Sequence, residues 1–216
     1  MSSETLDIKT FPLGPWMTNC YVLSVGQACW IIDCGLHPSE MFQYIEDQAL
    51  EPEAALLTHA HFDHIAGLQD LRTRWPELPI YVHTAESHFL TRPVHNLSAA
   101  LGEGIVAPEA THTIPSTGTF SLRDVEFRIH HTPGHSPGSV IFHQPDHRTV
   151  IAGDTLFLNS IGRTDFPHSN PALLIESIER HLLSLPDETT VHPGHGPSTT
   201  IGREKASNPF LNAAAR

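Results

Sequence analysis

The sequence predicts an α/β fold in which two β-sheets pack together and helices cover their outer faces. Two observations lead to this class. Both halves of the 216-residue chain contain short β-rich stretches followed by stretches with helical spacing of apolar residues. No short-period repeat, low-complexity tract or linker separates the halves, and the length suits one domain. We therefore expect a single domain over residues 1–216.

The first half predicts a strand meander that leads into alternating helices and strands. Gly26 separates the second and third of these strands. The expected strands are 6–11, 20–25, 29–33, 54–58 and 80–83. Helical spacing of apolar residues predicts helices at 38–48, 65–75 and 85–90, and Pro76 closes the second of them.

The pattern weakens over residues 92–115, which predict a long irregular region of the kind that often borders a functional site. Beyond it, the alternation of strands and helices returns. The expected strands are 125–131, 139–143, 149–152 and 189–192, and the expected helices are 171–183 and 201–207.

Composition excludes several functional classes. The net charge of −12 without a run of Lys or Arg argues against nucleic acid as a partner, and no apolar run is long enough for a membrane span. The first twenty residues lack a secretory signal pattern, so we expect a cytoplasmic protein. Cys20, Cys29 and Cys34 are interpreted as buried thiols. The 17 histidines outnumber the 12 Lys and Arg residues, which directs attention to metal binding.

The segment T-H-A-H-F-D-H-I-A-G at 58–67 is the densest group of metal-ligand types. His59 and His61 are two apart, so an extended segment places both rings on one side, where they can bind one metal. Asp63 and His64 follow where the chain turns into a helix and can reach a second metal. The alternative is that these are exposed loop histidines and that Asp63 caps the helix. Four ligand types in six residues favour the metal site.

Three further segments place a ligand type beside glycine. They are T-P-G-H-S-P-G-S with His135, A-G-D-T-L-F with Asp154, and H-P-G-H-G-P with His195. Glycine permits sharp turns and close backbone approach, which a shared metal pocket at strand ends requires.

In the order and type of these segments, the sequence resembles the metallo-β-lactamase-fold superfamily, in its glyoxalase II-like branch. The resemblance implies a four-layer αβ/βα sandwich of two mixed sheets with helices on both outer faces. It also implies a ligand set for two metals: His59, His61 and His135 for the first, Asp63, His64 and His195 for the second, and Asp154 as the bridge.

Two more segments are similar to the short, single-domain members of that branch. These are I-G-R-T-D-F-P at 161–167 and I-G-R-E-K-A-S-N-P-F-L at 201–211. We therefore expect no separate C-terminal glutathione-binding domain.

The resemblance implies a metal-dependent hydrolase, and specifically a thioesterase that cleaves S-acyl or hydroxyacyl glutathione, or a related thioester, with a metal-bridging hydroxide. Asp63 and Asp154 would be catalytic through the metals. The cofactors would be two divalent ions, with zinc expected and iron or manganese compatible. The expected partner is a small-molecule thioester or glutathione-derived substrate; nucleic acid and membrane are not expected, and no oligomeric state follows.

Two alternatives stay open. Persulfide dioxygenases resemble the same branch, and by that resemblance one iron would be held by His59, His135 and Asp154. A metal-binding protein without turnover is the other alternative. A β-lactamase of the commonest type would have cysteine in place of Asp154, so the sequence argues against that activity.

Two residues beside the ligands are candidates for supporting roles. Asp33 stands where the superfamily has an aspartate that orients ligand imidazoles, although a surface turn aspartate is the alternative. Arg163 could contact substrate or form a structural ion pair with Asp165.

Overall fold

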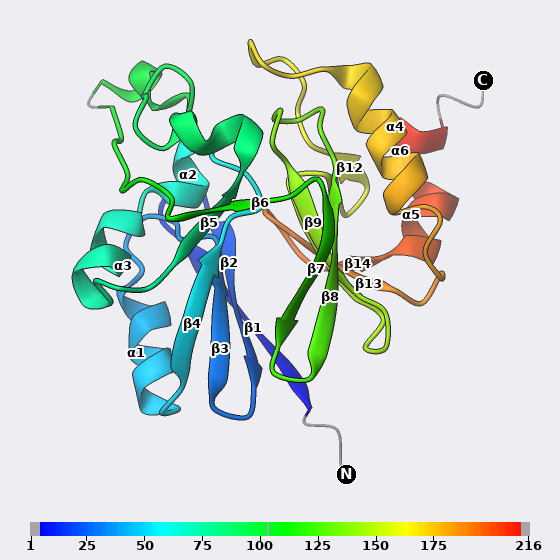
Figure 1. Ribbon diagram of the computed structural model, residues 1–216. Coiled ribbons are helices and arrows are strands. Elements are labelled where there is room, and N and C mark those ends of the chain that lie inside the picture. The colour runs from blue at the N-terminus through cyan, green and yellow to red at the C-terminus, as the bar shows by residue number, and fades with distance from the viewer. Residues whose placement is uncertain (1–4, 103, 213–216) are drawn as a thin grey trace. The chain divides into compact units, whose positions relative to one another are not determined.

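A computed structural model describes residues 5–102 and 104–212. The chain divides into two compact units (Figure 1). Of the described residues, the first comprises 5–102, 104–114 and 121–126, and the second comprises 115–120 and 127–212. The single-domain expectation stays a prediction. No helix in the described ranges is long and apolar enough to cross a membrane.

The first unit is built on a six-stranded mixed sheet in the order β1-β2-β3-β4-β5-β6. β2 is antiparallel to both β1 and β3, and β3 to β6 run parallel. Their bounds are Leu6–Leu13, Thr18–Val25, Ala28–Ile32, Glu51–Leu56, Ile80–His83 and His112–Ile114. The last of these lies in the region that we expected to be irregular.

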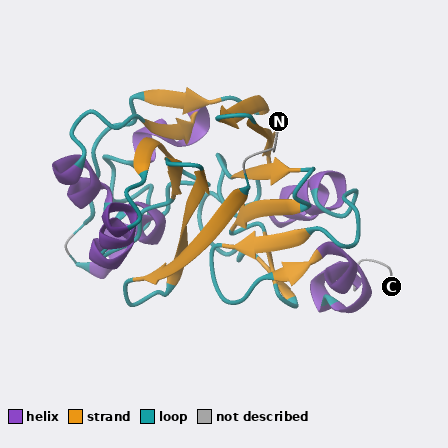
Figure 2. Ribbon diagram, turned by 90° about the horizontal axis from the view of Figure 1, so that it is seen from below, coloured by secondary structure: helices purple, strands orange, loops and turns teal. Residues whose placement is uncertain are grey.

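Figure 2 shows helices in purple beside strands in orange. The described residues of the first unit form five short helices. They are α1 (Ser39–Asp47), α2 (Phe62–Ile65), α3 (Leu68–Arg74) and the 3₁₀ helices η1 (Thr84–Phe89) and η2 (Ser98–Leu101). Apolar side chains of α1 and α3, such as Met41 and Leu71, form one buried cluster with sheet residues such as Ile31 and Ile80. Burying this surface is the main stabilising term, at about 25 cal/mol per Å².

The helix expected over 65–75 is interrupted at Gly67, so that prediction is wrong in this detail. A Cβ atom at Gly67 would lie 2.2 Å from the carbonyl oxygen of Gly35. The amide of Gly67 also donates to the carbonyl of Cys34. The turn after the third strand therefore packs directly against the chain between α2 and α3, which only glycine permits.

Another mixed sheet has the order β14-β13-β10-β9-β8-β7 and belongs to the second unit, except for the end of β7 and the start of β8 within residues 121–126. The strands β10 and β13 are parallel, whereas β9 is antiparallel to both β8 and β10. The bounds are Thr117–Leu122 (β7), Val125–His131 (β8), Val140–Gln144 (β9), Thr149–Gly153 (β10), Thr190–Pro193 (β13) and Thr199–Thr200 (β14). A two-stranded ribbon, β11 (Leu156–Phe157) and β12 (Ser160–Ile161), follows β10.

Within the described part of this unit, three helices follow: α4 (Pro171–His181), α5 (Ile201–Ser207) and α6 (Pro209–Asn212). Asn170 caps α4 by accepting hydrogen bonds from the amides of Ala172 and Leu173. Leu174 and Ile178 of α4 pack in a buried cluster with sheet residues such as Val150 and Val191. Both units therefore pair a mixed sheet with helices, which is the composition that the sequence predicted.

Candidate metal centre

The chain that follows β4 carries four ligand-type side chains of the first unit. His59, His61 and His64 are 1%, 3% and 0% exposed, so they are not surface loop histidines. The rings of His59 and His61 have centroids 4.7 Å apart, and those of His59 and His64 are 4.1 Å apart. Nε2 of His64 lies 3.6 Å from Oδ2 of Asp63. The structure thus brings these four predicted ligands together.

Asp63 does not cap the helix. His61 occupies the N-cap position of α2, and Asp63 lies in the first turn, where its Oδ2 accepts a hydrogen bond from the Thr18 hydroxyl at 2.8 Å. The alternative interpretation of Asp63 as a helix cap is therefore wrong. The hydrogen bond from Thr18 therefore attaches the Asp63 carboxylate to β2.

Asp33 is a buried hydrogen-bond acceptor at the centre of this group. It is 1% exposed, so it is not a surface turn residue. Its Oδ1 accepts from the amide of Thr58 at 2.8 Å, and its Oδ2 accepts from the Thr58 hydroxyl at 2.7 Å. Oδ2 also lies 2.8 Å from Nδ1 of His64. A carboxylate only accepts, so Nδ1 of His64 carries the hydrogen.

Hydrogen bonding also determines the tautomer of His59. Because the Thr58 hydroxyl donates to Asp33, its oxygen accepts from Nδ1 of His59, 3.2 Å away. In both imidazoles Nε2 then carries the lone pair that a metal requires. This hydrogen-bonding pattern fits a metal centre.

In the second unit, Asp154 lies between two histidines. Oδ2 of Asp154 is 3.5 Å from Nε2 of His135 and 3.6 Å from Nε2 of His195. These separations exceed an ordinary N–H···O hydrogen bond. They are close to the roughly 3.3 Å between ligand atoms that each lie about 2.0 Å from one tetrahedral ion.

The sheet of the second unit explains this convergence. Asp154 directly follows β10, and His195 comes two residues after β13, the parallel neighbour of β10. The amide of Gly194 donates to the carbonyl of Gly153, which ties the two strand ends together. Parallel neighbours end at the same edge, so both side chains lie there.

His135 is oriented by the segment that contains Arg163. Nδ1 of His135 donates to the carbonyl oxygen of Arg163 at 2.9 Å, which again leaves the lone pair on Nε2. Gly162 permits this approach, because a Cβ atom there would lie 2.0 Å from the Asp154 carbonyl oxygen and 3.0 Å from Cβ of His135. The sequence made the Arg163 side chain a candidate for substrate binding or an ion pair, but it did not predict this role of the backbone.

The Arg163 side chain takes no part in the hydrogen bond to His135. Its guanidinium forms two hydrogen bonds, of 2.8 and 2.7 Å, with the exposed carboxylate of Asp165 and lies over the ring of Phe166. The guanidinium holds the pKa of Asp165 down at about 2. Of the two roles considered for the side chain, the structure thus contains the ion pair.

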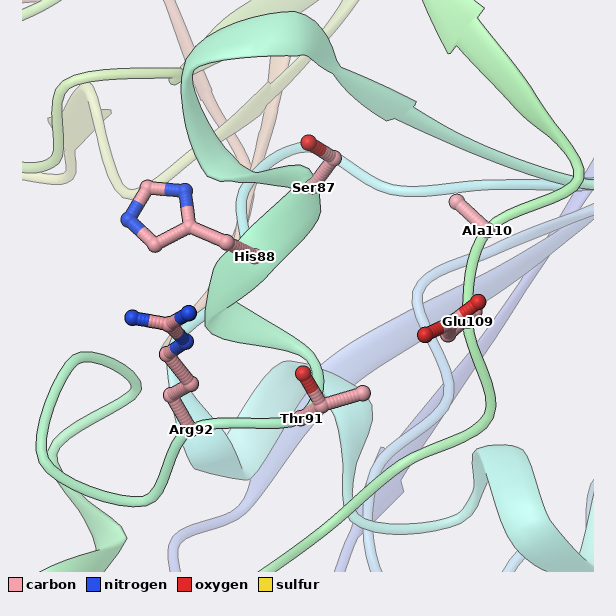
Figure 3. A pocket seen from close by; sticks show the side chains of 6 residues that line it. All are labelled: Ser87, His88, Thr91, Arg92, Glu109 and Ala110. Carbon is pink, nitrogen blue, oxygen red and sulfur yellow. The ribbon is translucent and has the colours of Figure 1, made fainter.

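A polar cavity of about 340 Å³ lies on the first unit, away from the predicted ligands. Its lining residues are Ser87, His88, Thr91, Arg92, Glu109 and Ala110 (Figure 3). His88 and Arg92 are on the same side of the η1 ribbon, while Glu109 and Ala110 come from the segment before β6. Three of the lining residues, Arg92, Glu109 and Ala110, lie in the region 92–115 that we expected to be irregular, but the sequence did not predict the cavity itself.

Comparison with known proteins decides the family. A model of the metallo-beta-lactamase superfamily matches residues 13–195. The chain belongs to this superfamily. A probable metallo-hydrolase, YqgX of Bacillus subtilis, is 42% identical over 205 residues, covering 94% of this chain and 97% of that protein. A protein named hydroxyacylglutathione hydrolase GloC, from Haemophilus influenzae, is 33% identical, covering 96% and 99%.

Solved structures confirm the metallo-β-lactamase fold. One titled BLEG-1 B3 metallo-beta-lactamase has a TM-score of 0.90 at 41% identity, covering 95% of this chain and 99% of that one. A di-iron-bound form of TTHA1623 has a TM-score of 0.84 at 39% identity, covering 94% and 100%. ETHE1 from Myxococcus xanthus has a TM-score of 0.76 at 25% identity, covering 95% and 85%. The chain is therefore a metallo-hydrolase of the metallo-β-lactamase superfamily.

Proposed function

We propose that the protein is a thioesterase of the glyoxalase II type, which hydrolyses hydroxyacyl glutathione or a related small thioester. The observation that carries this proposal is the match to hydroxyacylglutathione hydrolase GloC, which extends over 99% of that relative. The buried imidazoles and carboxylates described above support the proposal, because they are the ligand types that a hydrolytic metal centre requires.

The proposed centre uses the seven predicted ligands. His59, His61 and His135 would hold one divalent ion, Asp63, His64 and His195 the other, and Asp154 would bind both. When bound, such a pair supplies a water that ionises near neutral pH and positive charge for a developing oxyanion. Zinc is the expected metal; iron suits the same donors, and the related TTHA1623 structure is titled as di-iron-bound.

The chain's own residues would prepare this chemistry by fixing imidazole tautomers. Asp33 and Thr58 hold Nδ1 of His64 and His59, and the Arg163 carbonyl holds Nδ1 of His135. These contacts keep the rings oriented before substrate arrives, which lowers the cost of reorganisation during reaction. A thiolate leaves readily, so the proposed reaction does not need an additional general acid.

The assay that tests the proposal uses metal-replete protein with S-lactoylglutathione, simpler thioesters and a chromogenic cephalosporin. We expect thioester hydrolysis that a chelator abolishes and added zinc restores. Turnover of the cephalosporin but of no thioester would overturn the proposal in favour of β-lactamase activity, for which the similar BLEG-1 protein is named.

The second candidate is an iron-dependent persulfide dioxygenase. The similarity to ETHE1 at 25% identity favours keeping it, and His59, His135 and Asp154 would be the iron ligands. Oxygen consumption with glutathione persulfide by the iron-loaded protein, without thioester hydrolysis, would establish this activity instead.

A further inference from the structure

Two backbone amides within the metal-ligand loop of the first unit are held by residues that follow β5. The amide of Ala60, between His59 and His61, donates to Oε2 of Glu86 at 2.5 Å. The amide of Phe62, the residue after His61, donates to the carbonyl of Asn96 at 2.9 Å. The loop is thus fixed at every second residue, between the ligand side chains.

Glu86 reaches the loop because of the sheet topology. β4 and β5 are parallel neighbours, so the loop after β4 and η1 after β5 begin at the same edge. Glu86 lies in the first turn of η1. Ser87 and His88, the next two residues, line the polar cavity in Figure 3. Consecutive residues of η1 therefore contact the ligand loop and line this cavity.

The burial of Glu86 is unusual for its type. Its side chain is 0% exposed, although a glutamate is almost never fully buried unless it is paired or hydrogen-bonded. The hydrogen bond from the Ala60 amide satisfies part of the need of this buried side chain for a polar partner.

We propose that Glu86 is a positioning residue for the metal centre, holding the Ala60 peptide plane so that the flanking imidazoles converge. The inference rests on the proposed metal site. His59 and His61 are joined only through Ala60, so the orientation of that one residue sets the angle between their Cα–Cβ bonds. Loss of the acceptor lets the peptide rotate, and the two imidazoles diverge.

The consequence for metal binding is a loss of affinity. Replacing a group that orients metal ligands typically weakens binding 10- to 100-fold. A Glu86→Gln variant keeps a carbonyl oxygen of the same reach, so it preserves the hydrogen bond. A Glu86→Asp variant keeps the carboxylate but is one methylene shorter, so it loses the contact.

The test measures zinc affinity of the full-length chain by competition with a chromophoric chelator, and the absorption bands of the cobalt(II) form. Glu86→Ala and Glu86→Asp are expected to bind zinc 10- to 100-fold more weakly with altered cobalt bands. Glu86→Gln is expected to stay within about threefold of the unmodified protein. If Glu86→Ala does not fold, Glu86→Asp carries the test.

Leu71→Ala is the matched control, because Leu71 is a fully buried residue of α3 in the same unit. This variant should lose stability but keep the zinc affinity and the cobalt bands. Unchanged affinity and bands in Glu86→Asp, or a Glu86→Gln variant as weak as Glu86→Ala, would overturn the positioning role. Metal binding without thioester turnover in the unmodified protein would remove the proposed thioesterase while leaving this test intact.

Discussion

Oδ2 of Asp33 and Nδ1 of His64 lie 2.8 Å apart, and both side chains are buried. Oδ1 and Oδ2 also accept hydrogen bonds from Thr58, so this one carboxylate holds both Thr58 and His64 in place. The contact sets which nitrogen of His64 faces a metal, so it connects the packing of the fold to the chemistry of the site.

An Asp33→Asn substitution should impair binding at the second metal position. An amide nitrogen in place of Oδ2 would face the Nδ1 hydrogen, so His64 would be driven to the tautomer with its hydrogen on Nε2. Nε2 would then have no lone pair for the metal. We expect zinc affinity at that position to fall 10- to 100-fold. Metal analysis after dialysis checks this, with Asp47→Asn on the exposed face of α1 as the control. Equal metal content in the two variants would show that Asp33 does not orient His64.

Gly162→Ala should damage the second unit. The added Cβ would lie 2.0 Å from the carbonyl oxygen of Asp154, so the backbone beside His135 must shift. We expect a loss of stability of roughly 1–3 kcal/mol, as for other overpacked sites, together with weaker metal binding. Gly102→Ala is the comparison, since it is strained by its φ of +98° but meets no atom within 4 Å. If chemical denaturation and zinc titration give the same result for both, close approach at Gly162 is not what matters.

Acid should destabilise the fold through His143. Burial, helped by neighbouring His130 and Arg128, lowers the pKa of His143 from 6.5 to about 4. Between pH 6.5 and 4, His143 is protonated in the unfolded chain but not in the folded chain. The free energy of unfolding therefore falls as pH drops through this range and levels off below it. At about 1.36 kcal/mol per pKa unit, this one group contributes at most about 3 kcal/mol.

The measurement is urea unfolding of metal-free protein across that pH range, compared with His143→Gln, which cannot titrate. Removing the metal isolates the effect, because metal binding is itself pH-dependent. We expect a shallower pH dependence in the variant. A wild-type slope that His143→Gln leaves unchanged would assign the acid sensitivity to other groups.

His195→Ala should separate the two candidate activities. The thioesterase would use His195 as a ligand of the second ion, so we expect its kcat/KM to fall at least 100-fold, or about 2.7 kcal/mol. The dioxygenase would use only His59, His135 and Asp154, so its oxygen consumption would change little. Thioester and persulfide assays on the same preparation distinguish the outcomes, and a variant with full thioesterase activity would exclude a role for the second ion.

Much of the fold was predictable, because the apolar pattern reports strands and helices that are buried on one face. The strands expected at 80–83 and 125–131 match β5 and β8 to the residue. The strand β7 was missed because it is mostly exposed and carries little apolar signal. The interruption at Gly67 was missed because it depends on packing against Gly35, which lies 32 residues earlier.

The candidate ligands were predictable from spacing, because each lies beside glycine or within one short segment. The residues that orient them were predictable only in part. Asp33 was proposed from its place at a strand end, whereas Glu86 was not among the candidate residues. Its contact with Ala60 joins residues 26 positions apart, and no local pattern reports such a hydrogen bond.

The proposed thioesterase requires that side chains far apart in the sequence hold one pair of metal ions. Anomalous diffraction from crystals of the zinc-loaded protein, collected on both sides of the zinc absorption edge, tests it most directly. We predict two peaks about 3.5–4 Å apart, with Asp154 in contact with both. A single ion bound by side chains of one unit, or no ion near Asp154, would contradict the account.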